Sequence, residues 1–163
     1  MKRNWRTFLN GSEFKVMRLN DADAPDTILD QPQAIVDYLV PKLAESIIYR
    51  PDVENMIVVH LNTRRRPIGF EIVSNGTLDT LLVDTRNVFR SAIVSNSAAI
   101  VLCHNHPSGD PAPSQADKKV TSDLIRAGQL LKIEVLDHVI LGRSTLERPK
   151  AYSSLRELGL FFL

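Results

Sequence analysis

The spacing of apolar residues along the chain predicts amphipathic helices. An apolar residue at every third or fourth position forms one hydrophobic stripe on a helix, and this spacing recurs in four segments: 33–49, 84–97, 114–132 and 153–160. Pro41 lies inside the first segment, so we expect a kink there or a break into two short helices. Asp84 is a suitable N-cap for the second helix, and Gly159 is suited to end the last one.

Between these segments, shorter runs rich in apolar and β-branched residues predict strands. The runs cover 13–19, 55–62, 67–75, 77–83, 98–106 and 133–142. The polar turn TRRR joins the second run to the third, which predicts a hairpin. The run at 98–106 is apolar at nearly every position, as in a central strand that is buried on both faces. Strands therefore alternate with helices, and the expected fold class is α/β with a mixed sheet.

A change in composition divides the chain into two parts. Residues 1–30 hold a short predicted strand followed by a stretch rich in aspartate and proline, which is typical of a linker. The helices and the other strands are all predicted after this stretch. We therefore expect an N-terminal segment over 1–30 and a single domain over 31–163.

The overall composition excludes several classes of protein. Hydrophobic residues make up 44% of the chain and charged residues 24%, which is ordinary for a globular protein. The net charge of +1 gives no strong nucleic-acid signature. The sequence has no apolar run long enough to span a membrane and no secretory signal, so we expect a cytoplasmic protein. Cys103 is the only cysteine, which excludes an intrachain disulfide and a cysteine-rich zinc site.

The candidate chemistry lies in the stretch VLCHNHPSGDPAPSQAD. His104 and His106 stand two positions apart at the end of a predicted strand, so their side chains point the same way, while Cys103 points to the other side. Asp117 lies one turn into the next helix, where its carboxylate can face the histidines. Two imidazoles and one carboxylate suit Zn²⁺ and leave a fourth coordination position open for water.

A simpler interpretation of the same residues remains open. Ser114 and Asp117 have the spacing of a capping box at a helix start, which would account for both of them without a metal. An isolated His-x-His pair is also common without any function. The combination of a buried strand, paired histidines, a Pro-Gly turn and a carboxylate at the next helix start favours the metal site.

These residues resemble a known family. HNHPSGDPAPSQAD matches the JAMM (MPN+) metallopeptidase pattern H-x-H-P-x-x-x-x-x-x-S-x-x-D at every fixed position. With NGTL upstream and LDHVILG downstream, it resembles the bacterial RadC family, once linked to DNA repair, over roughly residues 35–160. The resemblance implies a deaminase-like JAB/MPN fold, in which helices flank a mixed, curved β-sheet. It also implies that His104, His106 and Asp117 bind zinc and that Ser114 stabilises the oxyanion of the reaction.

The family also requires a glutamate that acts as general base, and two residues are candidates. Glu54 opens the first strand after the first helix, where the glutamate of the family usually lies. Glu71 lies inside the next strand, where a solvent-facing or supporting role is the simpler interpretation. A base must first satisfy geometry, and we favour Glu54. The remaining histidines, His60 and His138, are expected to be strand residues, half-buried and buried in the core respectively.

Together these observations predict a zinc-dependent metallohydrolase of JAMM type. It would cleave a peptide or isopeptide bond in an unknown protein or peptide substrate by means of zinc-activated water. The alternative is a non-enzymatic metal-binding protein of DNA repair or mobile-element biology. A nucleobase deaminase has a similar fold but needs H-x-E with P-C-x-x-C, which a chain with one cysteine does not provide.

Overall fold

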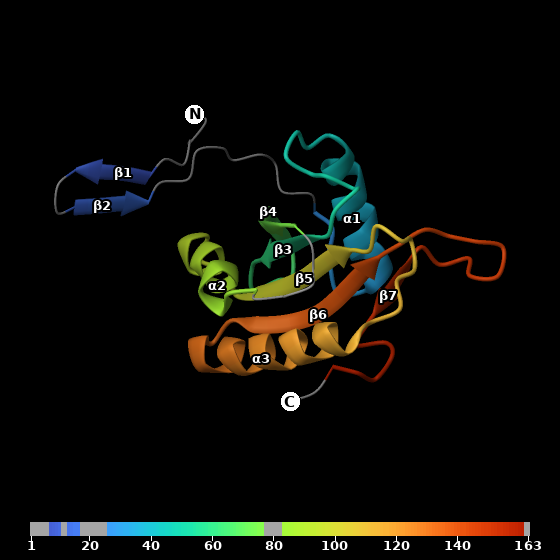
Figure 1. Cartoon of the computed structure of the whole chain (residues 1–163). Helices are drawn as coiled ribbons and strands as arrows, with labels where there is room; N and C mark the ends of the chain where they lie inside the picture. The colour runs from blue at the N-terminus through green and yellow to red at the C-terminus, as the bar shows by residue number, and fades with distance from the viewer. Residues whose placement is uncertain (1–6, 11–12, 17–25, 77–82, 162–163) are drawn as a thin grey trace.

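A five-stranded mixed sheet forms the centre of the protein, of which the computed structural model describes residues 7–10, 13–16, 26–76 and 83–161 (Figure 1). The strands are β3 (Asn55–Leu61), β4 (Pro67–Asn75), β5 (Ala99–Asn105), β6 (Glu134–Leu141) and β7 (Tyr152–Ser154). Their order across the sheet is β4-β3-β5-β6-β7. β5 and β6 run parallel, and the other neighbours run antiparallel. The predicted mixed sheet and its β3-β4 hairpin are confirmed.

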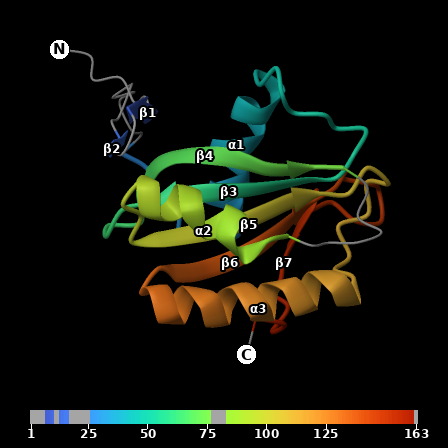
Figure 2. The same cartoon turned by 60° about the vertical axis from the view of Figure 1, so that its left-hand side comes forward.

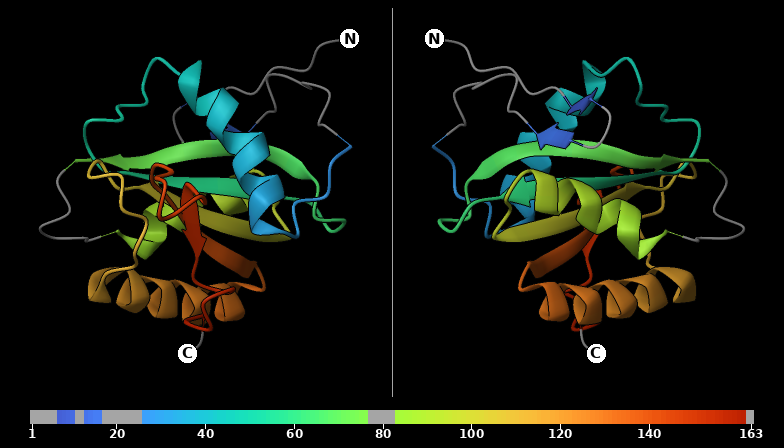
Figure 3. Two further views of the ribbon diagram at one scale, coloured as in Figure 1. Left: turned by 90° about the vertical axis from the view of Figure 1, so that its right-hand side faces the viewer. Right: turned by 90° about the vertical axis from the view of Figure 1, so that its left-hand side faces the viewer.

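Helices cover both faces of this sheet, as predicted (Figures 2 and 3). α1 (Pro32–Ala44) packs on one face, and α2 (Thr85–Val94) and α3 (Gln115–Leu131) pack on the other. Each helix contributes its apolar stripe to one of two cores. All seven residues of β5 are buried, because this strand lies between the two cores. This burial confirms the prediction of a central strand.

The two helices on the second face begin at the residues that the sequence indicates. The Asp84 carboxylate accepts a hydrogen bond of 3.0 Å from the backbone N–H of Arg86 and so caps α2. Ser114 caps α3 in the same way, and its contacts are part of the candidate site described below.

The first helix differs from the prediction in its second half. α1 continues through Pro41 as one helix and ends one turn later, at Ala44. Of the two outcomes expected at Pro41, a kink or a break into two helices, the break is therefore wrong. Leu43 is buried against the sheet, whereas Ile47 is fully exposed. Ile48 is also exposed, so the two isoleucines beyond Ala44 have no apolar surface to pack on, and packing rather than periodicity decides where the helix ends.

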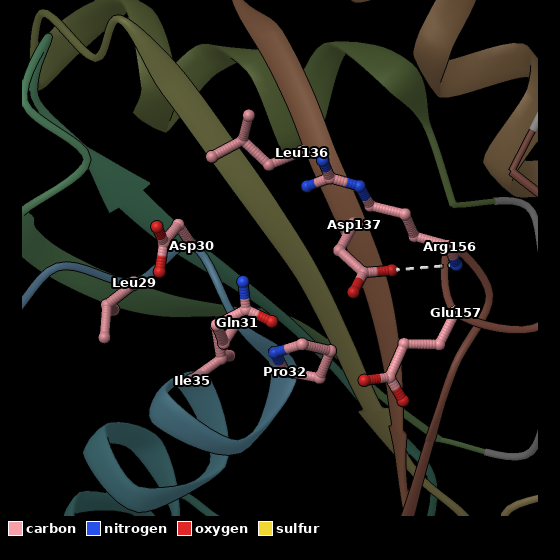
Figure 4. Close-up of a pocket in the computed structure, with 9 residues that line it drawn as sticks. All are labelled: Leu29, Asp30, Gln31, Pro32, Ile35, Leu136, Asp137, Arg156 and Glu157. Carbon is pink, nitrogen blue, oxygen red and sulfur yellow. Dashed lines mark hydrogen bonds between the residues drawn. The ribbon is translucent and has the colours of Figure 1, made fainter.

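The C-terminal segment also differs, because a buried carboxylate binds it. Residues 153–160, predicted as a helix, instead form part of β7 and a pair of turns. The Asp137 carboxylate, 2% exposed, accepts hydrogen bonds from Ser154 Oγ at 2.6 Å and from the Arg156 backbone N–H at 3.1 Å. Figure 4 shows the second bond beside a pocket of about 270 Å³. Because a buried carboxylate needs such partners, tertiary contacts override the local helical pattern.

At the N-terminal end, β1 (Thr7–Asn10) and β2 (Glu13–Val16) form a separate antiparallel two-stranded sheet. The strand predicted over 13–19 is present as β2, and β1 was not predicted. The strand predicted over 77–83 falls almost entirely outside the described residues. Among the helices that are described, none combines the length and the apolar character that a membrane crossing requires.

A histidine remote from the candidate site gives a testable consequence for stability. His60 on β3 is 4% exposed, more buried than expected, and burial lowers its pKa to about 4. An exposed histidine has a pKa near 6.5, so between about pH 6.5 and 4 the unfolded chain binds a proton that the folded protein does not. This difference in proton binding lowers the free energy of unfolding as the pH falls.

We therefore expect His60→Leu to lose less stability than the wild type between pH 7 and pH 4.5. The expected difference is about 2–3 kcal/mol, and denaturant titrations at the two pH values measure it. Other histidines titrate in both proteins and cancel in the comparison. An equal loss of stability in the two proteins would contradict the burial of a neutral His60.

Candidate metal centre

Three side chains from two elements meet beyond the C-terminal end of β5. His104 lies on β5, His106 directly follows it, and Asp117 lies in the first turn of α3. One ligand atom from each of the three lies within 4.8 Å of the others. His104 Nε2 is 2.9 Å from His106 Nε2 and 3.2 Å from Asp117 Oδ1. The structure therefore brings together the three residues that the sequence nominated as ligands.

The distances suit a tetrahedral metal ion. Nitrogen and oxygen donors bound to a tetrahedral zinc ion are about 3.3 Å apart, given bond lengths of about 2.0–2.2 Å. The two distances from His104 Nε2, 2.9 Å and 3.2 Å, lie close to that value. The closest approach of His106 Nε2 to Asp117 is 3.7 Å, to the other carboxylate oxygen, Oδ2. This donor set of two imidazoles and one carboxylate could hold a metal ion.

The capping box at the start of α3 orients the Asp117 carboxylate. Asp117 Oδ2 accepts hydrogen bonds from the Ser114 backbone N–H at 2.7 Å and from Ser114 Oγ at 2.6 Å. The Asp117 N–H in turn donates to Ser114 Oγ at 3.1 Å. Asp117 Oδ1 is buried and has no hydrogen-bond partner among the residues that the structure describes. A buried carboxylate oxygen without a partner is costly, and a metal ion would satisfy it.

Electrostatics keep the Asp117 carboxylate ionised. Burial alone raises its pKa, but His106, His104 and Ser114 together hold the pKa well below its usual range. The Asp117 carboxylate in turn raises the pKa of His106. Burial lowers the pKa of His104, which is 1% exposed. An ionised carboxylate beside two imidazoles is the charge state that binds a cation.

The loop after β5 orients His106. His106 Nδ1 donates to the Asp110 carbonyl oxygen at 2.6 Å, which leaves Nε2 directed at the other ligands. Arg148 holds this loop by donating to the Asp110 carboxylate at 3.1 Å and to the Gly109 carbonyl at 2.8 Å. Gly142 lies so close that a Cβ there would be 2.5 Å from the Gly109 carbonyl oxygen. The contacts of Arg148 and Gly142 could not be predicted from the sequence, because they join residues more than thirty positions apart.

His138 is a functional neighbour that the sequence analysis missed. It is fully buried, as expected of a core histidine, and burial lowers its pKa to about 4. Its Nε2 lies 2.8 Å from His104 Nδ1. The contact depends on the parallel register of β5 and β6, in which Leu102 lies opposite His138 and a bulge shifts the pairing. Apolar periodicity does not reveal such a register.

Glu54 lies at the edge of this site. It immediately precedes β3, in which Met56 lies opposite His104. Burial raises the pKa of the Glu54 carboxyl group, which also interacts electrostatically with His106 and Asp117. Its Oε2 atom is buried and, within the described part of the chain, has no hydrogen-bond partner. The charges of His106 and Asp117 in the ligand cluster therefore also act on the pKa of Glu54.

Glu71 lies farther from the cluster. It is on β4 opposite Val58, so β3 separates it from β5, and two strand spacings amount to about 10 Å. Its Oε1 lies 3.9 Å from Arg90 Nη2 on α2. Its Oε2 is buried and no described residue forms a hydrogen bond with it. An unpartnered oxygen is thus common to both glutamates, and proximity to the ligand cluster distinguishes them.

A pocket of about 250 Å³ reaches His106. Its lining is mainly apolar and comes from the end of α1, the loop that follows it and the end of β6: Val40, Leu43, Ala44, Tyr49, Pro51 and Leu141. Asn105 and Arg143 add polar groups. Cys103 is fully buried within the core on the α1 face, which agrees with its exclusion as a ligand.

Comparison with known proteins agrees with the sequence resemblance. The model of the RadC-like JAB domain matches residues 29–160. "UPF0758 protein STH371" of Symbiobacterium thermophilum is 41% identical over 132 residues, which are 81% of this chain and 52% of that protein. A "UPF0758 protein" of Pelodictyon phaeoclathratiforme is 48% identical over 107 residues, 66% of this chain and 46% of the relative. One from Methanosarcina mazei is 38% identical over 137 residues, 84% of this chain and 55% of the relative.

The chain spans about half the length of these curated relatives. The family match covers the sheet, all three helices and the three clustered side chains. On this evidence, the chain belongs to the family of RadC-like JAB domain proteins.

Proposed function

We propose that this domain is a zinc-dependent hydrolase that cleaves a peptide or isopeptide bond in a protein or peptide substrate. The observation that carries the proposal is the unpartnered, buried Asp117 Oδ1 beside two imidazole nitrogens. Three such ligands leave one coordination position open, as in catalytic rather than structural zinc sites. His104, His106 and Asp117 would hold the ion. When bound there, zinc would polarise a water molecule, lower its pKa to about 7 and stabilise the developing oxyanion.

Glu54 supplies the proton transfers in this proposal. Its carboxylate accepts the proton of the attacking water as the new carbon–oxygen bond forms, and then donates it to the nitrogen of the leaving amine. Burial raises the pKa of Glu54, which brings the group closer to the neutral range in which it can both accept and return a proton. The position of Glu54, two residues before Met56, which lies opposite His104, supports this role.

Ser114 would donate a hydrogen bond to the carbonyl oxygen of the scissile bond as negative charge develops on it. In the structure its hydroxyl donates to Asp117 Oδ2 instead. The proposal therefore requires the hydroxyl to rotate from the carboxylate toward the substrate while its oxygen still caps α3.

The apolar pocket beside His106 supports a peptide substrate. Its volume of about 250 Å³ and its lining from α1 and β6 suit one apolar side chain next to the bond that is cleaved. The partner of the domain in this proposal is thus an unfolded or extended segment of a protein that presents an apolar residue.

Incubation of the zinc-loaded protein with a diverse peptide mixture and with an isopeptide-linked peptide tests the proposal. Mass spectrometry should detect new peptide termini or the release of the isopeptide-linked branch, and a chelator should abolish both. Cleavage that persists in the chelated protein would indicate a contaminating peptidase. If the zinc-loaded protein cleaves neither class of bond, a non-enzymatic metal-binding role replaces this proposal.

The two roles of Ser114 can be separated by substitution. Ser114→Ala removes the cap and should cost about 1 kcal/mol of unfolding free energy, whereas Ser114→Asn should keep the cap. If the hydroxyl also serves the oxyanion, Ser114→Asn should lower kcat by an order of magnitude or more while the protein stays stable. Thermal unfolding and steady-state kinetics on both variants measure these effects. A stable Ser114→Asn variant with full activity would show that Ser114 caps the helix and does not stabilise the oxyanion.

A further inference from the structure

A chain of short hydrogen bonds runs from β5 through β6 to α3 behind the ligand cluster. His138 on β6 is fully buried. Its Nε2 lies 2.8 Å from His104 Nδ1, and its Nδ1 lies 2.6 Å from Thr121 Oγ1. Thr121 Oγ1 also lies 2.6 Å from the backbone carbonyl oxygen of Asp117, one helical turn earlier on α3. The chain thus connects His104 and Asp117 by a route that avoids their metal-facing atoms.

The direction of each hydrogen bond follows from the chemistry of its end groups. A carbonyl oxygen only accepts, so the Thr121 hydroxyl must donate to Asp117. The same hydroxyl has no second proton, so Thr121 Oγ1 must accept from His138 Nδ1–H.

A neutral His138 then determines the protonation of His104. Complete burial strongly disfavours a charged imidazole, so His138 has one ring proton, which resides on Nδ1. Its Nε2 therefore accepts, and His104 Nδ1 must donate to it. A neutral His104 with its proton on Nδ1 presents a lone pair on Nε2, the atom that faces His106 and Asp117.

We propose that His138 and Thr121 are positioning residues, which hold His104 in the tautomer that can bind a metal ion through Nε2. The inference rests on the metal site of the proposed function. The backbone N–H of His138 also donates to the Asp137 carboxylate, at 2.7 Å. His104 Nε2 therefore presents its lone pair to the metal position even in the metal-free protein.

Substitution of Thr121 tests the inference with little change in shape. Thr121→Val removes the hydroxyl and leaves His138 Nδ1 without its acceptor, whereas Thr121→Ser retains the hydroxyl. Partners of this kind typically contribute 10-fold to 100-fold to metal affinity. We expect Thr121→Val to weaken zinc binding by about that factor and Thr121→Ser to stay within about 3-fold of the wild type. Competition with a chromophoric chelator measures both.

A second readout reports the tautomer without any metal. Nitrogen–proton correlation NMR of the histidine rings should show His104 protonated at Nδ1 in the metal-free wild type. In Thr121→Val a second population protonated at Nε2 should appear. His138→Gln offers an independent check, because its amide oxygen can still accept from His104. It should retain more zinc affinity than His138→Leu.

A matched control comes from the opposite end of the sheet. His60 is also buried and lies 3.2 Å from a serine hydroxyl, that of Ser97. It pairs with Ile100, four residues before His104, or about 13 Å along the strand. His60→Leu should therefore leave the zinc affinity and the His104 tautomer unchanged.

The outcomes separate this inference from the proposed function. If Thr121→Val is folded and its zinc affinity and His104 tautomer are unchanged, His138 and Thr121 are not positioning residues. This holds even if the wild type binds zinc and cleaves peptides. If the wild type binds no zinc, the proposed function and the metal-directed role both fail. The NMR measurement then shows whether His138 and Thr121 still determine the tautomer of His104.

Discussion

Glu54→Gln is expected to retain its zinc and to lose between about 100-fold and 10,000-fold of kcat. Glutamine keeps the size of the side chain but cannot accept a proton at neutral pH. Zinc should remain, because Glu54 is not among the three side chains that cluster as ligands. The required measurements are the zinc content and the turnover of a responsive peptide or isopeptide substrate by the same preparation.

Glu71→Gln is the matched control for this variant. Glu71 also has one buried oxygen without a hydrogen-bond partner, but it lies two strands away from β5 and close to Arg90. Its replacement should leave most of the turnover intact. If Glu71→Gln is inactive and Glu54→Gln is active, the assignment of the general base to Glu54 is wrong and the two residues exchange roles.

The combined replacement of His104 and His106 by alanine is expected to abolish stabilisation by zinc. Free zinc at about 1,000 times the dissociation constant should stabilise the wild type by about 4 kcal/mol, because the folded protein binds the ion and the unfolded chain does not. The double variant retains Asp117 alone and should gain nothing. Thermal or chemical unfolding with and without zinc measures the difference.

Each protein is its own control, because its stability with zinc is compared with its stability without zinc. His104 is buried, so its truncation lowers the stability of the double variant even without metal. For this reason the zinc-induced change, rather than the absolute stability, is the quantity to compare. An equal gain in the double variant would place the bound zinc elsewhere on the chain.

The ligand cluster could be proposed from the sequence because its geometry is local. His104 lies on β5, His106 follows that strand directly, and Asp117 comes after a single loop, so their spacing suggests that the three lie near one another. The central position of β5 was also predictable from its unbroken apolar run. In both cases the information lies within about twenty consecutive residues.

The surroundings of the cluster were not predictable in the same way. The contact of His138 with His104 depends on how two distant strands pair and on a bulge between them. The proximity of Glu54 depends on the pairing of β3 with β5. The resemblance implied where the glutamate lies along the chain, but periodicity does not predict that pairing. The predicted C-terminal helix is wrong because Asp137, on the neighbouring strand β6, binds Ser154 and Arg156.

The metal content of the protein purified without added metal tests the central claim most directly. Elemental analysis should find about one zinc ion per chain in the wild type, because three clustered ligands make one site with an open position. A different bound metal would revise only the identity of the ion. Wild-type protein that contains no metal and takes up none when zinc is supplied would contradict the account.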